Sequence, residues 1–141
     1  MFDLNDCAAF ITSNASKVLA VRLEKRMSAY HVTRAQWLAI YYLDKQPGMT
    51  QNQLAECLGS KGSTVVSLVD HLERSGYVVR TANALDRRIK QVHLTKKGTE
   101  LNRKLTVIAE KFKNDAIKNI DEDSLNEYKH VIEMMLENTE Q

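Results

Sequence analysis

Residues 50–78 read TQNQLAECLGSKGSTVVSLVDHLERSGYV, and this stretch decides the fold. Thr50 and Gln53 have the spacing of a capping box, in which a threonine side chain caps a helix and a glutamine three residues later reaches back to it. Gly59 is expected to end this first short helix. A second helix follows after a tight turn, with an apolar face made of Val65, Leu68, Val69 and Leu72.

The second helix is expected to end at Ser75-Gly76, because glycine readily adopts the left-handed conformation found at helix C-termini. Two short helices joined by a turn of three or four residues that contains glycine predict a helix-turn-helix. Downstream, residues 77–81 and 89–94 are β-branched or alternating runs separated by the polar loop 82–88. This pattern predicts a two-stranded hairpin, the wing of a winged helix-turn-helix.

The sequence on either side of this unit predicts further helices. Apolar residues at three- and four-residue steps indicate a long amphipathic helix over about residues 4–29. Thr33 is a candidate N-cap for the next helix, which Pro47-Gly48 should end, and Thr95 is a candidate N-cap for a long helix after the hairpin. A last helix is expected over about residues 121–138. The predicted fold is mainly α with a small β-hairpin wing.

Length and composition limit the class of protein. A chain of 141 residues is about one domain long, and its content of 43% hydrophobic and 27% charged residues is ordinary for a folded protein that is not embedded in a membrane. The first ten residues carry no basic side chain, unlike a secretory signal, and no apolar run approaches the roughly 18 residues of a membrane span. We therefore expect one cytoplasmic domain over residues 1–141.

Positive charge gathers in the middle of the chain. Residues 50–98 contain eight basic and four acidic side chains, whereas residues 114–141 contain two basic and eight acidic ones. A basic central module beside an acidic flank is the pattern of a protein that contacts nucleic acid with one part of its surface. A winged-helix module that binds another protein instead is the alternative, and the basic wing argues against it.

An enzyme, a cofactor and a metal site are not expected. The sequence contains no Gly-x-Gly-x-x-Gly, Gly-x-Ser-x-Gly or His-Glu-x-x-His motif. Cys7 and Cys57 are far apart, and neither has a Cys-x-x-Cys spacing or a nearby histidine that would indicate zinc.

Three motifs carry a resemblance to a known family. They are the TQ-x-x-LA-x-x-LG pattern of residues 50–59, the Ser63–Val78 pattern of the second helix and its exit, and Asp86-Arg87-Arg88 followed by V-x-LT-x-x-G at residues 92–98. Together they make the chain resemble the MarR family of winged helix-turn-helix transcriptional regulators. The resemblance implies a homodimer that binds a palindromic operator, most often as a ligand-responsive repressor. It also implies a DNA-binding part over about residues 33–98 and dimerisation helices over about 1–30 and 99–141.

The resemblance and the helical periodicity together give the candidate DNA contacts. The 100° step of the second helix turns Ser63, Thr64, Val66, Ser67, Asp70 and His71 outward. Hydroxyls in its first turn suit phosphate, although Ser63 could equally serve as a cap. The resemblance places Arg88 of the wing in the minor groove, with Asp86 orienting an arginine or securing the loop. The full set of candidate DNA-contacting residues is Thr50, Lys61, Ser63, Thr64, Val66, Ser67, His71, Arg87, Arg88 and Lys90.

The chain departs from the family at two positions on the second helix. Gly62 and Ser67 stand where a long cation is common, so we expect sequence selectivity to depend more on Asp86-Arg87-Arg88 and on groove shape than on direct purine contacts.

The resemblance also suggests two regulatory sites. Aromatic and basic residues around the second predicted helix could bind an aromatic or phenolic effector, although most of them could equally be ordinary core or surface residues: Tyr30, His31, Arg34, Trp37 and Tyr41. One branch of the family senses peroxides through a cysteine in the first helix, and Cys7 is a candidate for that role. A cysteine on an apolar stripe is more often a small buried hydrophobe.

Overall fold

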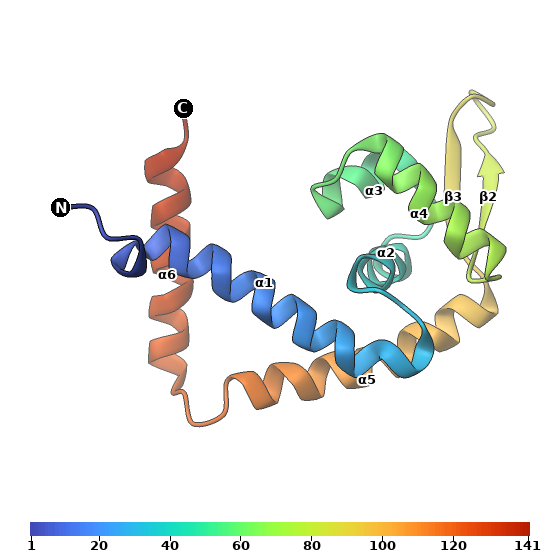
Figure 1. The fold of residues 1–141 in the computed structure, drawn as a ribbon. Helices are drawn as coiled ribbons and strands as arrows, with labels where there is room; N and C mark the ends of the chain where they lie inside the picture. Colours follow the sequence, from blue (N-terminus) through green and yellow to red (C-terminus); the bar gives the residue numbers. More distant parts are fainter.

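The structure is a computed structural model that describes residues 1–141. It contains six α-helices and one small antiparallel sheet (Figure 1). The helices are α1 (Ala8–Met27), α2 (Arg34–Lys45), α3 (Gln51–Leu58), α4 (Gly62–Arg74), α5 (Lys96–Ala116) and α6 (Glu122–Thr139). The strands are β1 (Met49–Thr50), β2 (Val78–Ala82) and β3 (Lys90–Leu94). The predicted fold class, mainly α with a small wing, is confirmed. None of the helices combines the length and the apolar character that crossing a bilayer requires.

The single long helix predicted over residues 4–29 is wrong at both ends. Leu4–Asp6 form a separate 3-10 turn, in which the Asp3 carboxylate accepts a hydrogen bond from the Asn5 backbone N–H at 2.9 Å. Cys7 is extended, with ψ at 110°, so α1 begins only at Ala8. A short side chain that bonds to nearby backbone competes with helix in this way. At the other end a second 3-10 turn, Ser28–Tyr30, replaces the last predicted turn.

Side-chain caps fix where four helices begin. Thr33 and Thr50 each accept a hydrogen bond from the backbone N–H three residues later, and the glutamine at that position reaches back to complete a capping box. Thr95 and Asp121 cap α5 and α6 by the same first contact. These bonds satisfy backbone donors that a helix N-terminus otherwise leaves free. The capping box predicted at Thr50 and the cap predicted at Thr95 are confirmed.

The sheet has the order β1-β3-β2, so β3 is its central strand. The hairpin pairs Val78 with Leu94 and ends at Ala82 and Lys90. The end at Leu94 is as predicted, and the other three strand boundaries each lie one residue later than predicted. A third strand, β1, was not predicted from the sequence; in it Met49 pairs with Val92. Because β1 leads directly into α3, this two-residue strand ties the base of the wing to the start of the helix-turn-helix.

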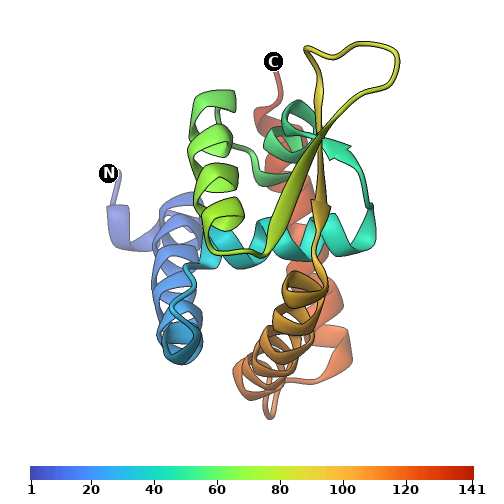
Figure 2. The same cartoon turned by 90° about the vertical axis from the view of Figure 1, so that its right-hand side faces the viewer.

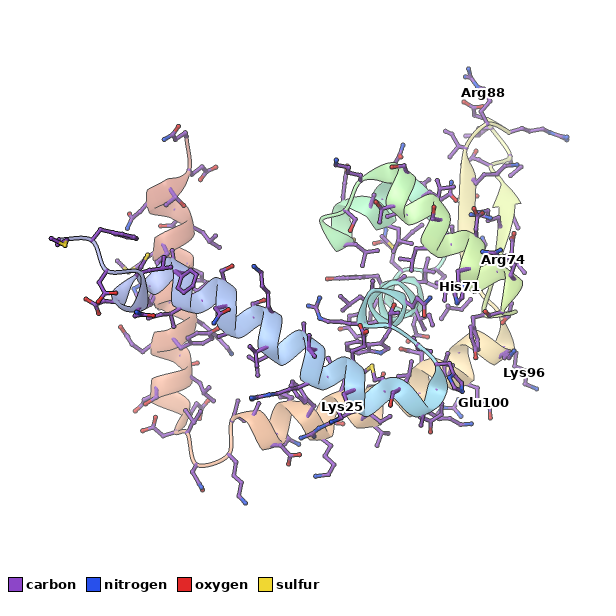
Figure 3. All side chains as sticks on the ribbon, viewed as in Figure 1. Lys25, His71, Arg74, Arg88, Lys96 and Glu100 are labelled. Atoms are coloured by element: carbon purple, nitrogen blue, oxygen red, sulfur yellow. The ribbon has the colours of Figure 1, made fainter.

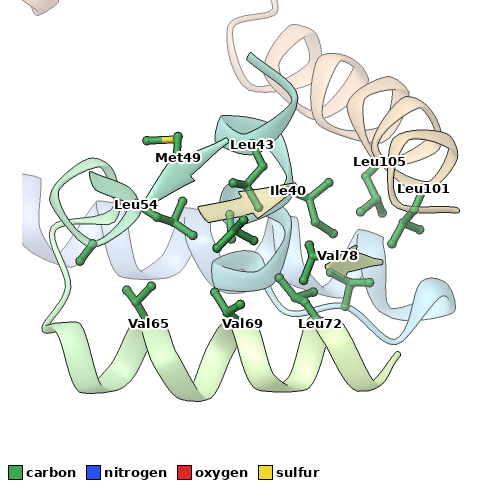
Figure 4. Packing of buried hydrophobic residues seen from close by; sticks show 14 of the residues in the cluster. Ile40, Leu43, Met49, Leu54, Val65, Val69, Leu72, Val78, Leu101 and Leu105 are labelled. Atoms are coloured by element: carbon green, nitrogen blue, oxygen red, sulfur yellow. The ribbon is translucent and has the colours of Figure 1, made fainter. Parts of the chain in front are cut away.

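The hydrophobic core lies inside the helix-turn-helix and its immediate neighbours. Ile40 and Leu43 of α2, Val69 and Leu72 of α4, and other buried side chains from the strands and from the first half of α5 meet there (Figure 4). Gly98 belongs to this packing, since a Cβ at that position would collide with the backbone carbonyl oxygen of Tyr77. We call α2–α4 with the sheet the lobe.

The helices at the two ends of the chain contribute little to this core. In Figure 1, α6 and the first half of α1 stand apart from the lobe, and α5 runs from one region to the other. An ion pair of 2.7 Å between Arg26 and Asp115 joins α1 to α5, and the Arg26 guanidinium lies 5.0 Å from the centre of the Phe112 ring. No residue of α6 is buried. The end helices therefore expose most of the apolar faces that their sequences predict.

Candidate nucleic-acid interface

The recognition helix of the predicted motif is α4. Its apolar face, with Val65, Val69 and Leu72, is buried against the lobe, whereas Ser63, Thr64, Val66, Ser67 and His71 are exposed as the periodicity predicts. Lys61 is the N-cap residue, and its side chain makes no capping hydrogen bond. The first turn of α4 therefore presents hydroxyls and backbone N–H groups next to an exposed lysine, which suits contact with phosphate.

A groove of about 510 Å³ runs along one flank of α4, between that helix and the start of α2. Thr64, Ser67 and His71 line it from α4, and so does Arg74, which the sequence analysis did not select. Figure 3 shows His71 and Arg74 on the C-terminal half of the helix. Arg34, which the resemblance suggested as an effector contact, lies on the opposite wall. The groove thus places two guanidinium groups and an imidazole beside the recognition helix.

The wing ends in a loop that side-chain hydrogen bonds hold in shape. Asn83 accepts hydrogen bonds through its side-chain oxygen from the backbone N–H groups of Leu85, at 2.8 Å, and Asp86, at 3.3 Å. Asparagine commonly forms such turns with the backbone two residues further on. The loop projects beyond the helices at its end of the molecule (Figure 2). Asn83 therefore stabilises the wing loop. An asparagine in a polar loop is a signal that could have predicted this role.

Asp86 and Arg88 form the ion pair at the tip of the wing. The Asp86 carboxylate accepts hydrogen bonds from the Arg88 backbone N–H at 3.0 Å, from Nε at 3.1 Å and from a terminal guanidinium nitrogen at 3.1 Å. The Arg88 side chain is still 91% exposed, and it lies at the far end of the hairpin in Figure 3. Arg87 forms no ion pair. Asp86 therefore orients one arginine while the neighbouring arginine stays free.

These contacts also affect protonation. The hydrogen bonds from the Arg88 side chain and then from its backbone N–H lower the pKa of Asp86, and the carboxylate in turn raises the pKa of Arg88. Both shifts favour the ionised forms, and so the ion pair between Asp86 and Arg88.

The structure brings three of the predicted contacts together where the wing meets α3. Thr50, Arg88 and Lys90 line one small cleft of about 190 Å³, together with Gln51, Asn52 and Ile89, which the sequence analysis did not select. The strand β1 makes this possible, since it holds the start of α3 against β3.

Arg80 is the residue that sequence reasoning missed most completely. Its side chain makes four hydrogen bonds, to the Gln51 side chain, the Val66 carbonyl oxygen and the carboxylates of Asp70 and Glu73. Asp70 faces outward from α4, as predicted, but its carboxylate forms an ion pair of 2.6 Å with the Arg80 guanidinium. Nothing in the local sequence distinguishes Arg80 from a solvated strand residue.

The residues suggested for an effector are distributed over several surroundings. Tyr41 lines a pocket of about 450 Å³ between α2 and α5, whereas Arg34 lies on the groove beside α4. The rings of Trp37 and Tyr41 lie 5.9 Å apart, and the Trp37 indole N–H is buried without a hydrogen-bond partner. Tyr30 is half-buried and His31 is exposed at the turn before α2. Trp37 and Tyr41 therefore lie next to each other, whereas Arg34 lines a different pocket from Tyr41.

Cys7 lies at the N-terminus of α1, where it is half-buried and makes no side-chain hydrogen bond. Cys57 is exposed on α3. No cluster of three or more histidine, cysteine or acidic side chains has the arrangement of a metal site.

Comparison with known proteins places this geometry in a family. A model of the MarR family matches residues 31–89, which include α2, the helix-turn-helix and the wing tip. The transcriptional regulator PA3341 is 32% identical in sequence, over 92% of this chain and 96% of that one, with a TM-score of 0.82.

Two further solved structures share the fold. MepR of S. aureus, solved as a complex with DNA, is 24% identical over 95% of this chain and 97% of its own, with a TM-score of 0.84. CouR of Rhodococcus jostii RHA1, bound to p-coumaroyl-CoA, is 23% identical over 96% of this chain and 95% of its own, with a TM-score of 0.83. Because both the family model and a full-length relative match, this chain belongs to the MarR family of DNA-binding transcriptional regulators.

Proposed function

We propose that the protein is a homodimer that binds a palindromic operator in duplex DNA and represses transcription until a small molecule releases it. The observation that carries the DNA-binding part is the combination of an exposed recognition helix with an oriented arginine at the wing tip. The recognition helix α4 would enter the major groove, with Ser63, Thr64 and Val66 nearest the bases. Arg88 would enter the minor groove, whose negative potential favours a guanidinium.

The surface area of the chain supports a dimer. The structure exposes 10383 Å². A compact monomer of 16.1 kDa exposes about 7,400 Å². The excess is about 3,000 Å² for each chain, enough for the extensive interface of a permanent dimer.

The position of the exposed apolar side chains says where the second copy would bind. They concentrate on α1 and α6 and include Val18, Val21, Val131, Met134 and Leu136. A groove of about 510 Å³ between these helices, lined by Ile132, Met135 and Leu136 among others, adjoins a second one of about 470 Å³ that reaches α5. Such patches on a folded protein usually mark an interface. A second copy would bring its own α1 and α6 to the same surface and close the grooves by symmetry.

The pocket between α2 and α5 is our candidate for the effector site. Tyr41 lines it beside Lys45 and Arg103, and Asn102 on its wall is the one buried polar residue of the structure. Asp44 also lines this pocket, and its carboxylate is outnumbered by the two cations. An aromatic ring, an amide and this excess of positive charge suit a small aromatic molecule that carries a carboxylate or phenolate. Because α2 belongs to the lobe and α5 continues toward the end helices, a ligand here could favour one spacing of the two recognition helices over another.

Selection of binding sites from a random pool of duplex DNA tests the proposal. We expect the protein to enrich a palindrome whose half-sites lie about one helical turn apart, and to bind it less tightly as salt increases. Footprinting of the enriched duplex with phenols and aromatic carboxylates then tests release. Enrichment of no sequence, or of a site without twofold symmetry, would contradict the proposal.

A further inference from the structure

We propose that Arg80 is a positioning residue, which fixes the recognition helix relative to α3 and the wing and thereby supports discrimination between DNA sequences. This inference rests on the DNA binding proposed above. Arg80 lies on β2, and its side chain reaches both helices of the helix-turn-helix. It is the only side chain that forms hydrogen bonds to both of them.

The contacts of Arg80 connect three elements. Nε donates to the Gln51 side-chain oxygen, at the first residue of α3, at 2.9 Å. The terminal nitrogens donate to the Val66 carbonyl oxygen at 3.1 Å, to Asp70 at 2.6 Å and to Glu73 at 3.2 Å, all on α4. The Arg80 backbone N–H also donates to Glu73, at 3.0 Å. One planar group therefore fixes the angle between α3, α4 and β2.

Geometry also argues that Arg80 acts through other residues and not through DNA. Only 17% of its side chain is exposed, compared with 91% for Arg88. The four hydrogen bonds use four of the five N–H donors that a guanidinium has. Little capacity remains for a phosphate. Because the guanidinium is rigid and forked, a lysine at this position would keep the charge but could not reach the same acceptors together.

The arrangement has an electrostatic consequence for α4. Asp70 and Glu73 lie on one side of a helix that would approach phosphate groups, and both carboxylates would repel them. Arg80 offsets this charge from within the protein. Loss of Arg80 would therefore change the orientation of α4 and the charge on it, and the test must separate these two effects.

The test measures binding of the Arg80→Lys variant to two fluorescent duplexes, the palindrome enriched by the wild-type protein and a shuffled duplex of the same composition. We expect the preference for the palindrome to fall at least about tenfold, while the dependence of affinity on salt concentration stays as in the wild type. A variant that was only less stable would lose active protein and would bind both duplexes less in equal proportion. Circular dichroism melting shows that the variant is folded at the assay temperature.

Three results would overturn the proposal. The first is a wild-type preference in Arg80→Lys, which would show that charge alone suffices. The second is a salt dependence reduced by about one counterion in Arg80→Gln, which removes the charge, and this would show that Arg80 contacts phosphate directly. The third is recovery of the preference in the triple variant Arg80→Met, Asp70→Asn, Glu73→Gln, which would reduce the role of Arg80 to neutralising two carboxylates.

A milder variant keeps the proposal testable if Arg80→Lys does not fold. Gln51→Ala removes only the contact with α3, and we expect it to lower the preference by a smaller factor without changing the melting temperature. An unchanged preference in this variant would contradict the proposal. Failure of the wild-type protein to enrich any duplex would instead contradict the proposed function, so the two failures can be told apart.

Discussion

The lobe and the end helices differ in how much of their apolar surface the chain itself buries. In the lobe, side chains from α2, α3, α4 and the sheet bury one another. Arg80 forms hydrogen bonds with polar groups that lie between these elements. In the end helices, which are longer, amphipathic sequences leave side chains such as Val21 and Leu136 exposed. The difference teaches that one region completes its core within the chain, whereas the other leaves apolar faces exposed, which the dimer proposed above would cover.

The largest effect should come from a charge on the end helices. Leu136 of α6 is 67% exposed, so Leu136→Glu costs little in a monomer. In a dimer it would bury an unpaired carboxylate, at a cost of several kcal/mol, and symmetry would bury two. We expect dimer affinity to fall at least about 100-fold, as measured by sedimentation velocity.

A matched control uses the lobe. Leu85→Glu introduces the same charge at a leucine of the wing tip that is 98% exposed, and it should leave the oligomeric state unchanged. Equal sedimentation of the wild type and Leu136→Glu would mean that α6 is not at the interface.

The next largest effect should come from the tight packing where the lobe meets α5. Gly98→Ala places a Cβ against the Tyr77 carbonyl oxygen, which is backbone and cannot rotate away. We expect the free energy of unfolding to fall by about 3 kcal/mol, measured in urea at fixed protein concentration. Gly62→Ala is the control, because a Cβ there meets open space at the start of α4. Similar stability of the two variants would show that α5 can move away from the sheet.

A smaller effect is expected at the wing. Arg88→Ala should weaken binding of the enriched palindrome by about 1 to 3 kcal/mol while the dimer stays intact. Arg87→Ala tests whether the unpaired neighbour contributes as well, and Asp86→Asn tests the orientation of Arg88. Fluorescence anisotropy at constant salt measures all three. Binding by Arg88→Ala that equals that of the wild type would remove Arg88 from the interface.

The smallest effect concerns the ion pair that joins α1 to α5. Hydrogen bonds first from Arg26 and then from Lys111 lower the pKa of Asp115. A carboxyl group whose pKa is lower in the folded state stabilises that state above its unfolded pKa of about 3.9, and this contribution is lost as the pH falls through the folded pKa. Acid should therefore weaken the wild type more than Asp115→Asn. Urea midpoints at pH 6 and pH 3 measure the difference.

Glu133→Gln on α6 is the control for this prediction, since Glu133 forms no ion pair. A wild type and an Asp115→Asn variant that lose stability equally in acid would show that the pair contributes nothing.

Whether a feature could be predicted from the sequence depends on how far apart in the sequence the interacting residues lie. The caps at Thr50 and Thr95 depend on residues within one turn, and their positions were predicted correctly. The strand β1 and the contact of Arg80 with Gln51 join residues 29 or more positions apart, and no local pattern marks them. Cys7 shows where periodicity fails as a predictor. Its spacing fits the apolar stripe of a longer helix, but its backbone is extended and α1 begins only after it. The resemblance to the MarR family selected Arg88 and predicted that Asp86 orients an arginine or secures the loop. The place of Arg88 beside Thr50 joins residues 38 positions apart, and no local pattern marks it.

The arrangement of Trp37 has a practical consequence. It is the only tryptophan in the chain, and its ring lies beside Tyr41, whose own side chain lines the pocket between α2 and α5. Indole emission responds to the polarity and hydrogen bonding of its surroundings, and here the indole N–H is buried with no acceptor. The unmodified protein thus carries an intrinsic fluorophore next to the proposed effector site. A change in its emission spectrum on titration with aromatic acids would report occupancy in solution, without a label and without DNA.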